Sequence, residues 1–300
     1  MTSADGTRIA VYLSSAASDA HPPDAAAAEG ASSGAVSAGA ELPTVLAVHG
    51  YPDNASVWDQ VVQRLAVQCR VLRYDVRGTG CSDKPRSRAS YRWQRLAEDA
   101  RAVLDAYSPE RPVHLLAHDW GSVQGWYLVS ESAERFASFT SISGPNVAYF
   151  RPWIRAKLAA REFGPVLRQV AHSSYIAFFR MPLLPELAWR TGLIDRVLAR
   201  REPPARRGLP DKLNGLQLYR ANLLTRSGPR PRPVRLPVLV IAPTRDAYIS
   251  PDMAIETPRP FVADLQTRLV AAGHWLPLTH PDYVAAAVRS MIERSWPHRR

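Results

Sequence analysis

The 300-residue sequence contains few of the features that mark secreted, metal-binding or membrane-spanning proteins. Its two cysteines, Cys69 and Cys81, match no metal or redox spacing, which indicates two reduced thiols. The first twenty residues lack the basic start and apolar block of a signal peptide. No run reaches eighteen apolar residues, because the most apolar stretch, 175–189, is interrupted by two prolines and two charged residues. The sequence therefore predicts a cytoplasmic protein without a membrane span.

Lysine is also scarce, since it supplies only three of the 38 basic residues, and the formal net charge is +11. Residues 151–235 contain 18 Lys and Arg against five Asp and Glu, whereas the rest of the chain contains 20 against 22. That basic segment has no interleaved aromatic platform, so we expect no nucleic-acid partner. Two interpretations stay open: a solvated basic surface, or contact with acidic lipids or anionic substrates.

Apolar strand patterns alternate with helical patterns along most of the chain. This alternation is typical of a parallel sheet covered by helices on both faces. Residues 14–42 are rich in Ala, Ser, Gly and Pro, and we expect a flexible loop there. The expected strands are 7–13, 44–50, 70–75, 112–119, 138–144, 238–246 and 268–275, and the expected helices are 55–68, 91–107, 121–132 and one from Pro281.

The alternation is interrupted between residues 145 and 235 by a helical segment rich in Arg and Pro. This is the segment that carries the excess positive charge. A late helical insertion in an α/β sheet predicts a lid over the carboxyl ends of the strands, where such sheets bind ligands. We therefore expect a core formed by residues 1–144 and 236–300, with a helical lid formed by residues 145–235.

Asp119 follows the apolar strand pattern HLLAH directly and precedes the helical pattern that begins near Gly121. Small residues, Ala117 and Gly121, lie two positions before and two positions after it. A sharp turn from strand to helix needs small residues at these positions, because the apex is strained and crowded. The arrangement is that of the nucleophile elbow of α/β-hydrolases, with Asp in place of Ser.

With this elbow, the chain resembles an α/β-hydrolase-fold epoxide hydrolase. The resemblance covers nearly the whole chain apart from residues 14–42. The resemblance implies a mostly parallel eight-stranded sheet with a helical lid after strand 6. It is strongest to the hydrolase half of proteins that fuse an epoxide hydrolase to a short-chain dehydrogenase. The chain ends at Arg300 without a dehydrogenase half, so the resemblance implies a possible partner dehydrogenase. The motifs are His49-Gly50-Tyr51-Pro52, the glycine turn at 77–83, His118-Asp119-Trp120-Gly121 and Gly273-His274-Trp275.

A carboxylate nucleophile at Asp119 would form an alkyl ester, whose hydrolysis requires a general base. His274 lies at the end of the last expected strand, where the fold places its histidine. Asp246 follows an earlier expected strand, and we assign it as the acid that orients His274. Asp252 and Asp264 lie nearby in the sequence and remain alternatives for that role.

The backbone N–H groups of Tyr51 and Trp120 are the expected oxyanion-hole donors, since one follows the first core strand and the other follows the nucleophile. The resemblance further implies two lid tyrosines that donate hydrogen bonds to the epoxide oxygen. Tyr219 and Tyr175 match them, and Tyr149 could replace Tyr175. The residues expected to contact substrate are His49, Trp120, Phe178 and Trp275.

The sequence thus predicts an epoxide hydrolase that forms a vicinal diol from a small hydrophobic or amphiphilic epoxide. We expect neither a metal nor an organic cofactor. Haloalkane dehalogenases share the Asp-Trp elbow and are the alternative, with Trp153 or Trp189 as the second halide donor. A second alternative is a non-catalytic domain that binds ligands or acts as a scaffold.

Overall fold

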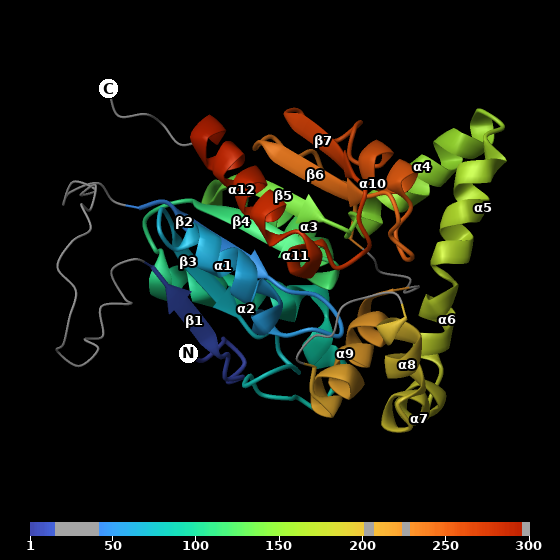
Figure 1. Cartoon of the computed structure of the whole chain (residues 1–300), viewed down its shortest axis with the longest axis horizontal. Helices are drawn as coiled ribbons and strands as arrows, with labels where there is room; N and C mark the ends of the chain where they lie inside the picture. The colour runs from blue at the N-terminus through green and yellow to red at the C-terminus, as the bar shows by residue number, and fades with distance from the viewer. Residues whose placement is uncertain (16–41, 201–206, 224–228, 296–300) are drawn as a thin grey trace.

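The structure is a computed structural model that describes residues 1–15, 42–200, 207–223 and 229–295. Most of the loop expected at 14–42 lies outside the described residues. Figure 1 shows one central sheet with helices on both faces and a group of helices beyond one end of it.

In the described part of the chain the sheet has seven strands in the order β1-β3-β2-β4-β5-β6-β7. Only the edge strand β1 is antiparallel to its neighbour, and all other neighbours are parallel. The mostly parallel α/β sheet expected from the alternating pattern is therefore confirmed. The strands are β1 (Val11–Ser14), β2 (Thr44–Val48), β3 (Arg70–Tyr74), β4 (Val113–His118), β5 (Phe136–Ile142), β6 (Val238–Pro243) and β7 (Leu265–Val270).

Two details of the expected sheet are wrong. The resemblance implied eight strands, but the residues before β1 form only an isolated bridge, between Thr2 and Arg8, in place of another strand. As a result the lid follows the fifth strand rather than the sixth. The last strand ends at Val270 rather than at 275, because the chain leaves the sheet there, and His274 lies in the loop that follows.

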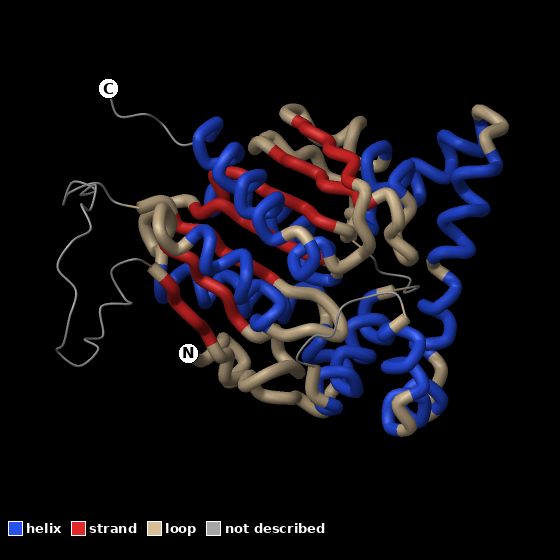
Figure 2. Tube along the Cα trace, in the orientation of Figure 1, coloured by secondary structure: helices blue, strands red, loops and turns tan. Residues whose placement is uncertain are grey.

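Strand side chains alternate between two hydrophobic cores, one on each face of the sheet. Figure 2 shows the helices that cover the strands on both faces. Val45 and Ala47 of β2 pack in one core with α1 (Asp59–Leu65) and α12 (Pro281–Ser295). Leu46 and Val48 pack in the other core with α2 (Trp93–Tyr107) and α3 (Trp120–Glu131). Both faces are thus buried, which explains the continuous apolar runs of β2, β4 and β6. The remaining core helices are η1 (Ala55–Trp58), η2 (Arg88–Tyr91), η3 (Ala133–Arg135), α10 (Pro251–Glu256) and α11 (Leu276–Thr279).

Helices α4 to α9, here called the lid helices, lie between β5 and β6 in the sequence and beyond the end of the sheet in space (Figure 1). Asn222 joins the last of them to the core, since its side chain accepts the N–H of Trp93 at 3.0 Å and donates to the carbonyl of Tyr91 at 2.7 Å. No helix among the described residues is long and apolar enough to cross a membrane. The lid helices are α4 (Val147–Ala159), α5 (Phe163–His172), α6 (Ser174–Arg180), α7 (Leu184–Arg190), α8 (Leu193–Ala199) and α9 (Leu209–Asn222).

Candidate active site

Asp119 occupies the turn between β4 and α3 in a conformation that L-residues rarely adopt, with φ at 51° and ψ at −123°. The turn is tight because Gly121 lies against β2: a Cβ at Gly121 would be 2.1 Å from the carbonyl oxygen of Val48. A Cβ at Gly144 would be 2.2 Å from the carbonyl oxygen of Asp119. A strained residue at such a turn is typical of a functional site, and its side chain lies above the carboxyl ends of the strands.

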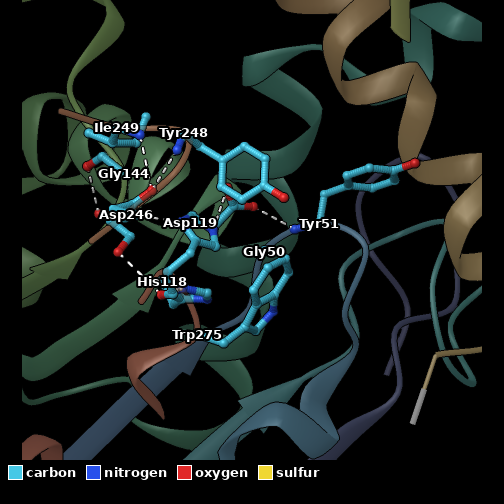
Figure 3. Close-up of polar contacts among 12 residues, drawn as sticks. Gly50, Tyr51, His118, Asp119, Gly144, Asp246, Tyr248, Ile249 and Trp275 are labelled. Atoms are coloured by element: carbon cyan, nitrogen blue, oxygen red, sulfur yellow. Dashed lines mark hydrogen bonds and ion pairs between the residues drawn. The ribbon is translucent and has the colours of Figure 1, made fainter. Parts of the chain in front are cut away.

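His274 lies between two carboxylates. Its Nε2 is 3.5 Å from Oδ2 of Asp119, and its Nδ1 is 2.9 Å from Oδ2 of Asp246. The other oxygen of Asp246 accepts the N–H groups of Tyr248 at 2.8 Å and Ile249 at 3.0 Å (Figure 3). The carboxylate of Asp246 is therefore fixed on two sides and orients the imidazole.

The alternatives to Asp246 lie elsewhere in the structure. Asp252 pairs with Arg168 at 2.7 Å, and Asp264 pairs with Arg294 at 2.7 Å. Of the three acids that the sequence offered, only Asp246 contacts the His274 ring in the part of the chain that the structure describes.

The pKa of His274 reflects its two acidic neighbours. Burial lowers that pKa, but the charge of Asp246 and then the contact with Asp119 outweigh burial and raise it to about 10. For Asp246 the directions are reversed. Burial raises the pKa of Asp246, but the charge and hydrogen bond of His274 and the two backbone N–H groups hold that pKa below its ordinary value. The two carboxylates beside the ring therefore favour the protonated form of His274.

An N–H donor faces the carboxylate of Asp119 from the loop after β2. The backbone N–H of Tyr51 donates to Oδ1 of Asp119 at 2.7 Å (Figure 3). Gly50 permits this approach, because a Cβ there would be 2.3 Å from the same oxygen. Trp120 is the first residue of α3, and an N–H in the first turn of a helix has no intrahelical acceptor. The Tyr51–Pro52 peptide bond is cis.

Two cavities meet at Asp119. The larger, about 800 Å³, is also lined by Trp120, Tyr175 and Tyr219. The smaller, about 420 Å³, is lined by the same two tyrosines together with His274. Phe178 and Trp275, which we expected to contact substrate, line the smaller cavity. Both lid tyrosines thus lie on the cavity walls that include the Asp119 carboxylate.

The two lid tyrosines are able to donate a proton over the whole physiological range. Burial, followed by the charge of Asp119, raises the pKa of Tyr175 above its ordinary value. Burial also raises the pKa of Tyr219 well above its ordinary value, with smaller contributions from Tyr175 and Asp119. Their rings lie 5.9 Å apart, centroid to centroid. Two protonated hydroxyls therefore sit near one carboxylate.

Two sequence predictions do not fit this arrangement. His49 was expected to contact substrate, but it lines neither cavity, because its ring is held by the N–H of Val76 at 2.9 Å and by Thr79 at 3.2 Å. Tyr149, the alternative to Tyr175, is fully buried and donates to the carbonyl of Arg232 at 2.7 Å. Tyr175 is therefore the first lid tyrosine that faces Asp119.

Sequence reasoning missed Tyr248, which lines the smaller cavity between the lid and the triad. Its ring lies 4.8 Å from that of His274 and 5.2 Å from that of Tyr175, centroid to centroid. The turn that places it is set by the two N–H bonds to Asp246, and no strand or helix periodicity indicates such a turn. Its only clue in the sequence is its position two residues after the assigned acid.

His118 adjoins the triad and yields a prediction about acid stability. Its Nε2 lies 2.9 Å from the carbonyl oxygen of His274. Burial, then the charge of His274, lowers the pKa of His118 to about 4. A histidine whose pKa is lower in the folded state than in the unfolded state stabilises the fold at pH values above the unfolded pKa. That stabilisation is lost as the pH falls towards the folded pKa.

His118→Gln retains an N–H donor but cannot titrate. Between about pH 7 and pH 4, we expect the unfolding free energy of the wild type to fall by roughly 3 kcal/mol more than that of this variant. Urea unfolding across that range measures the difference. Parallel curves for the two proteins would show that His118 is not held neutral by the fold.

Comparison with known proteins identifies the architecture. The family model described as alpha/beta hydrolase fold matches residues 43–281. The chain belongs to the α/β-hydrolase fold family. A crystal structure of Bacillus megaterium epoxide hydrolase with an inhibitor aligns with this α/β-hydrolase at a TM-score of 0.71, with 18% identity, covering 98% of this chain and 99% of that one.

Among curated relatives, the probable oxidoreductase EphD of Mycobacterium tuberculosis is 36% identical over 275 residues. That match covers 84% of this α/β-hydrolase but only 46% of the relative, so the chain spans about half of that protein's length. Human epoxide hydrolase 4 is 25% identical, with 84% of this chain and 72% of the relative covered.

In the described residues no group of three or more His, Cys, Asp and Glu could hold a metal ion.

Proposed function

We propose that this α/β-hydrolase is an epoxide hydrolase that works through a covalent ester on Asp119. The observation that carries the proposal is the arrangement around this carboxylate: His274 and Asp246 lie behind it, and Tyr175 and Tyr219 line the same cavities. A carboxylate nucleophile suits attack on an sp³ carbon, and paired hydroxyls suit a leaving oxygen that remains attached to the substrate. The similarity to named epoxide hydrolases supports this assignment.

In the first step Oδ2 of Asp119 attacks one epoxide carbon. We assign this oxygen because Oδ1 is engaged by the N–H of Tyr51. The carbon–oxygen bond of the ring breaks, and the leaving oxygen takes a proton from Tyr175 or Tyr219. The product of this step is a β-hydroxyalkyl ester of Asp119, and the tyrosine regains its proton later from solvent.

In the second step His274 first loses its extra proton to solvent and then, as a neutral ring, removes a proton from water, and the resulting hydroxide attacks Cγ of Asp119. Formation of the ester has neutralised one of the two carboxylates that raise the pKa of His274, so that pKa falls when a base is needed. The N–H groups of Tyr51 and Trp120 stabilise the tetrahedral oxyanion. The intermediate collapses as the alkoxide leaves and takes the proton of the new Asp119 carboxyl, which gives the vicinal diol, the free carboxylate and protonated His274.

The contacts of two tryptophans favour epoxides over haloalkanes. A dehalogenase needs a second N–H donor at the leaving halide. The indole N–H of Trp153 donates to Glu256 at 2.7 Å, and that of Trp189 donates to the hydroxyl of Tyr51 at 2.7 Å. Both candidate donors are therefore engaged with protein acceptors.

The walls of the larger cavity bear on the substrate class. They are mostly apolar, but Arg151, Arg155 and Arg230 line them together with Asp119. This composition suits an amphiphilic epoxide whose anionic group lies near the arginines while its apolar part reaches Asp119. Equal turnover of an epoxy acid and its methyl ester would contradict this assignment.

The tyrosine pair provides the test of this function. We expect wild-type protein to convert styrene oxide to its diol, and each of Tyr175→Phe and Tyr219→Phe to slow ester formation by about 10- to 100-fold. The double variant should be slower still, since no hydroxyl then protonates the leaving oxygen. Tyr149→Phe is the matched control, because its hydroxyl faces a backbone carbonyl away from both cavities. Stopped-flow fluorescence under single-turnover conditions measures the rate. Unchanged rates in both single variants, or absence of diol from the wild type, would refute the proposal.

A further inference from the structure

Exposed apolar side chains are concentrated on the lid. Among the described residues, fourteen large apolar side chains are exposed, and eleven of them belong to the lid helices or their connections. The other three are Leu13, Val67 and Leu269, which lie apart from one another on the core. An apolar surface confined to one part of a protein marks an interaction site.

The exposed residues of α5 form a stripe. Phe163, Leu167 and Val170 are spaced at i, i+4 and i+7, and they are 53%, 66% and 55% exposed. Gln169, on the opposite side of the helix, is buried and hydrogen-bonds to Ser250. The apolar face of α5 therefore points outward, which is the reverse of an ordinary surface helix.

A second apolar group lies at the start of α7. Leu183, Leu184 and Leu187 are 77%, 55% and 57% exposed and share one side of the helix end. Leu183 also has a positive φ of 65°, a conformation that glycine or asparagine adopts at less cost. A leucine in this conformation, displayed to solvent, serves no packing purpose within the described chain. Figure 1 shows α5, α6 and α7 along the edge of the molecule farthest from the sheet.

Positive charge surrounds these apolar groups. The acids Glu162, Glu186 and Asp195 are each paired with a basic side chain of the lid helices. By contrast, several exposed arginines form no ion pair within the described residues. These arginines are Arg151, Arg155, Arg161, Arg190, Arg196 and Arg200.

We propose that the outer face of the lid helices binds anionic membrane surfaces. Leucines and a phenylalanine among arginines have the composition of an interfacial membrane-binding surface, where apolar side chains enter the acyl boundary and guanidinium groups bind lipid phosphates. A second copy of this chain would present the same positive charge and would be repelled. A phospholipid surface supplies both the apolar interior and the negative charge.

Both cavities that reach Asp119 are lined in part by exposed apolar residues of the lid helices. Val170 of the α5 stripe lines the larger cavity, and Leu193 and Val197, exposed on α8, line the smaller one. An apolar substrate dissolved in a bilayer would therefore meet side chains that belong both to the membrane-binding surface and to a cavity wall. The membrane-binding surface itself does not depend on the proposed reaction.

Vesicle flotation tests the surface without using activity. The probe is vesicles of equal parts phosphatidylcholine and phosphatidylglycerol, compared with pure phosphatidylcholine. We expect the wild type to bind the anionic vesicles and to bind the neutral ones about tenfold less. A variant with Leu183→Asn, Leu184→Gln and Leu187→Gln should bind the anionic vesicles about tenfold less than the wild type. Asparagine tolerates the positive φ, and glutamine preserves the helix.

The matched control substitutes the exposed apolar residues of the core: Leu13→Gln, Val67→Gln and Leu269→Gln should leave vesicle binding within about twofold of the wild type. A second variant, Arg190→Gln with Arg196→Gln, should weaken binding only to anionic vesicles. Unchanged thermal unfolding of each variant shows that it is folded. Absence of vesicle binding by the wild type, or equal binding by the leucine variant, would overturn the proposal. So would concentration-dependent dimers that the leucine variant abolishes without any vesicle binding.

Discussion

Asp119→Asn should lower kcat for epoxide hydrolysis by at least about 10⁴-fold, because a neutral amide cannot form the ester. The side chain keeps its shape and an oxygen that can accept the N–H of Tyr51, so we expect the fold to be retained. Diol formation and thermal unfolding measure the two effects. Asp252→Asn is the control, since that carboxylate pairs with Arg168 at the surface. Substantial residual turnover by Asp119→Asn would contradict a carboxylate nucleophile.

If Asp119 is the nucleophile, the oxygen atom of the attacking water should remain in the wild-type enzyme after one turnover. In a single turnover in ¹⁸O-labelled water, the labelled oxygen should enter Asp119, and the diol should carry none. Label in the diol would mean that water attacks the epoxide directly.

His274→Gln should lower steady-state turnover by about 10³-fold while slowing ester formation much less, because only the second step needs the base. The expected result is consumption of about one epoxide per active site followed by near arrest. Rapid-quench analysis of substrate loss measures both phases. His280→Gln is the matched control, because this exposed histidine follows α11 away from the cavities. Equal loss of both phases would place His274 outside the second step.

The fold was predictable because apolar strand patterns alternate clearly with helical patterns in the sequence. Buried parallel strands such as β2 and β4 have continuous apolar sequences, and the glycines that crowd Asp119 mark the elbow. The error in strand count arose at the N-terminal edge. Pairing there depends on backbone hydrogen bonds from Ser3 to Thr7 and from Ile9 to Met1, which leave no periodic pattern in so short a segment.

The arrangement of the candidate site was predictable where sequence order fixes the geometry. Asp119, Asp246 and His274 each follow a strand, and the carboxyl ends of parallel strands meet at one edge. The role expected of His49 failed because local hydrogen bonds hold its ring against the backbone. Tyr248 was not predicted from the sequence, because a turn, rather than a periodic element, directs its side chain into the cavity.

The central claim is that Asp119 is esterified by an epoxide, and intact mass spectrometry of His274→Gln tests it most directly. The protein would be incubated separately with styrene oxide and with a bromoalkane, then digested to map the modified peptide. We expect the mass of one whole epoxide on Asp119. An adduct formed only from the bromoalkane, an adduct on another residue, or no adduct from the epoxide would contradict it.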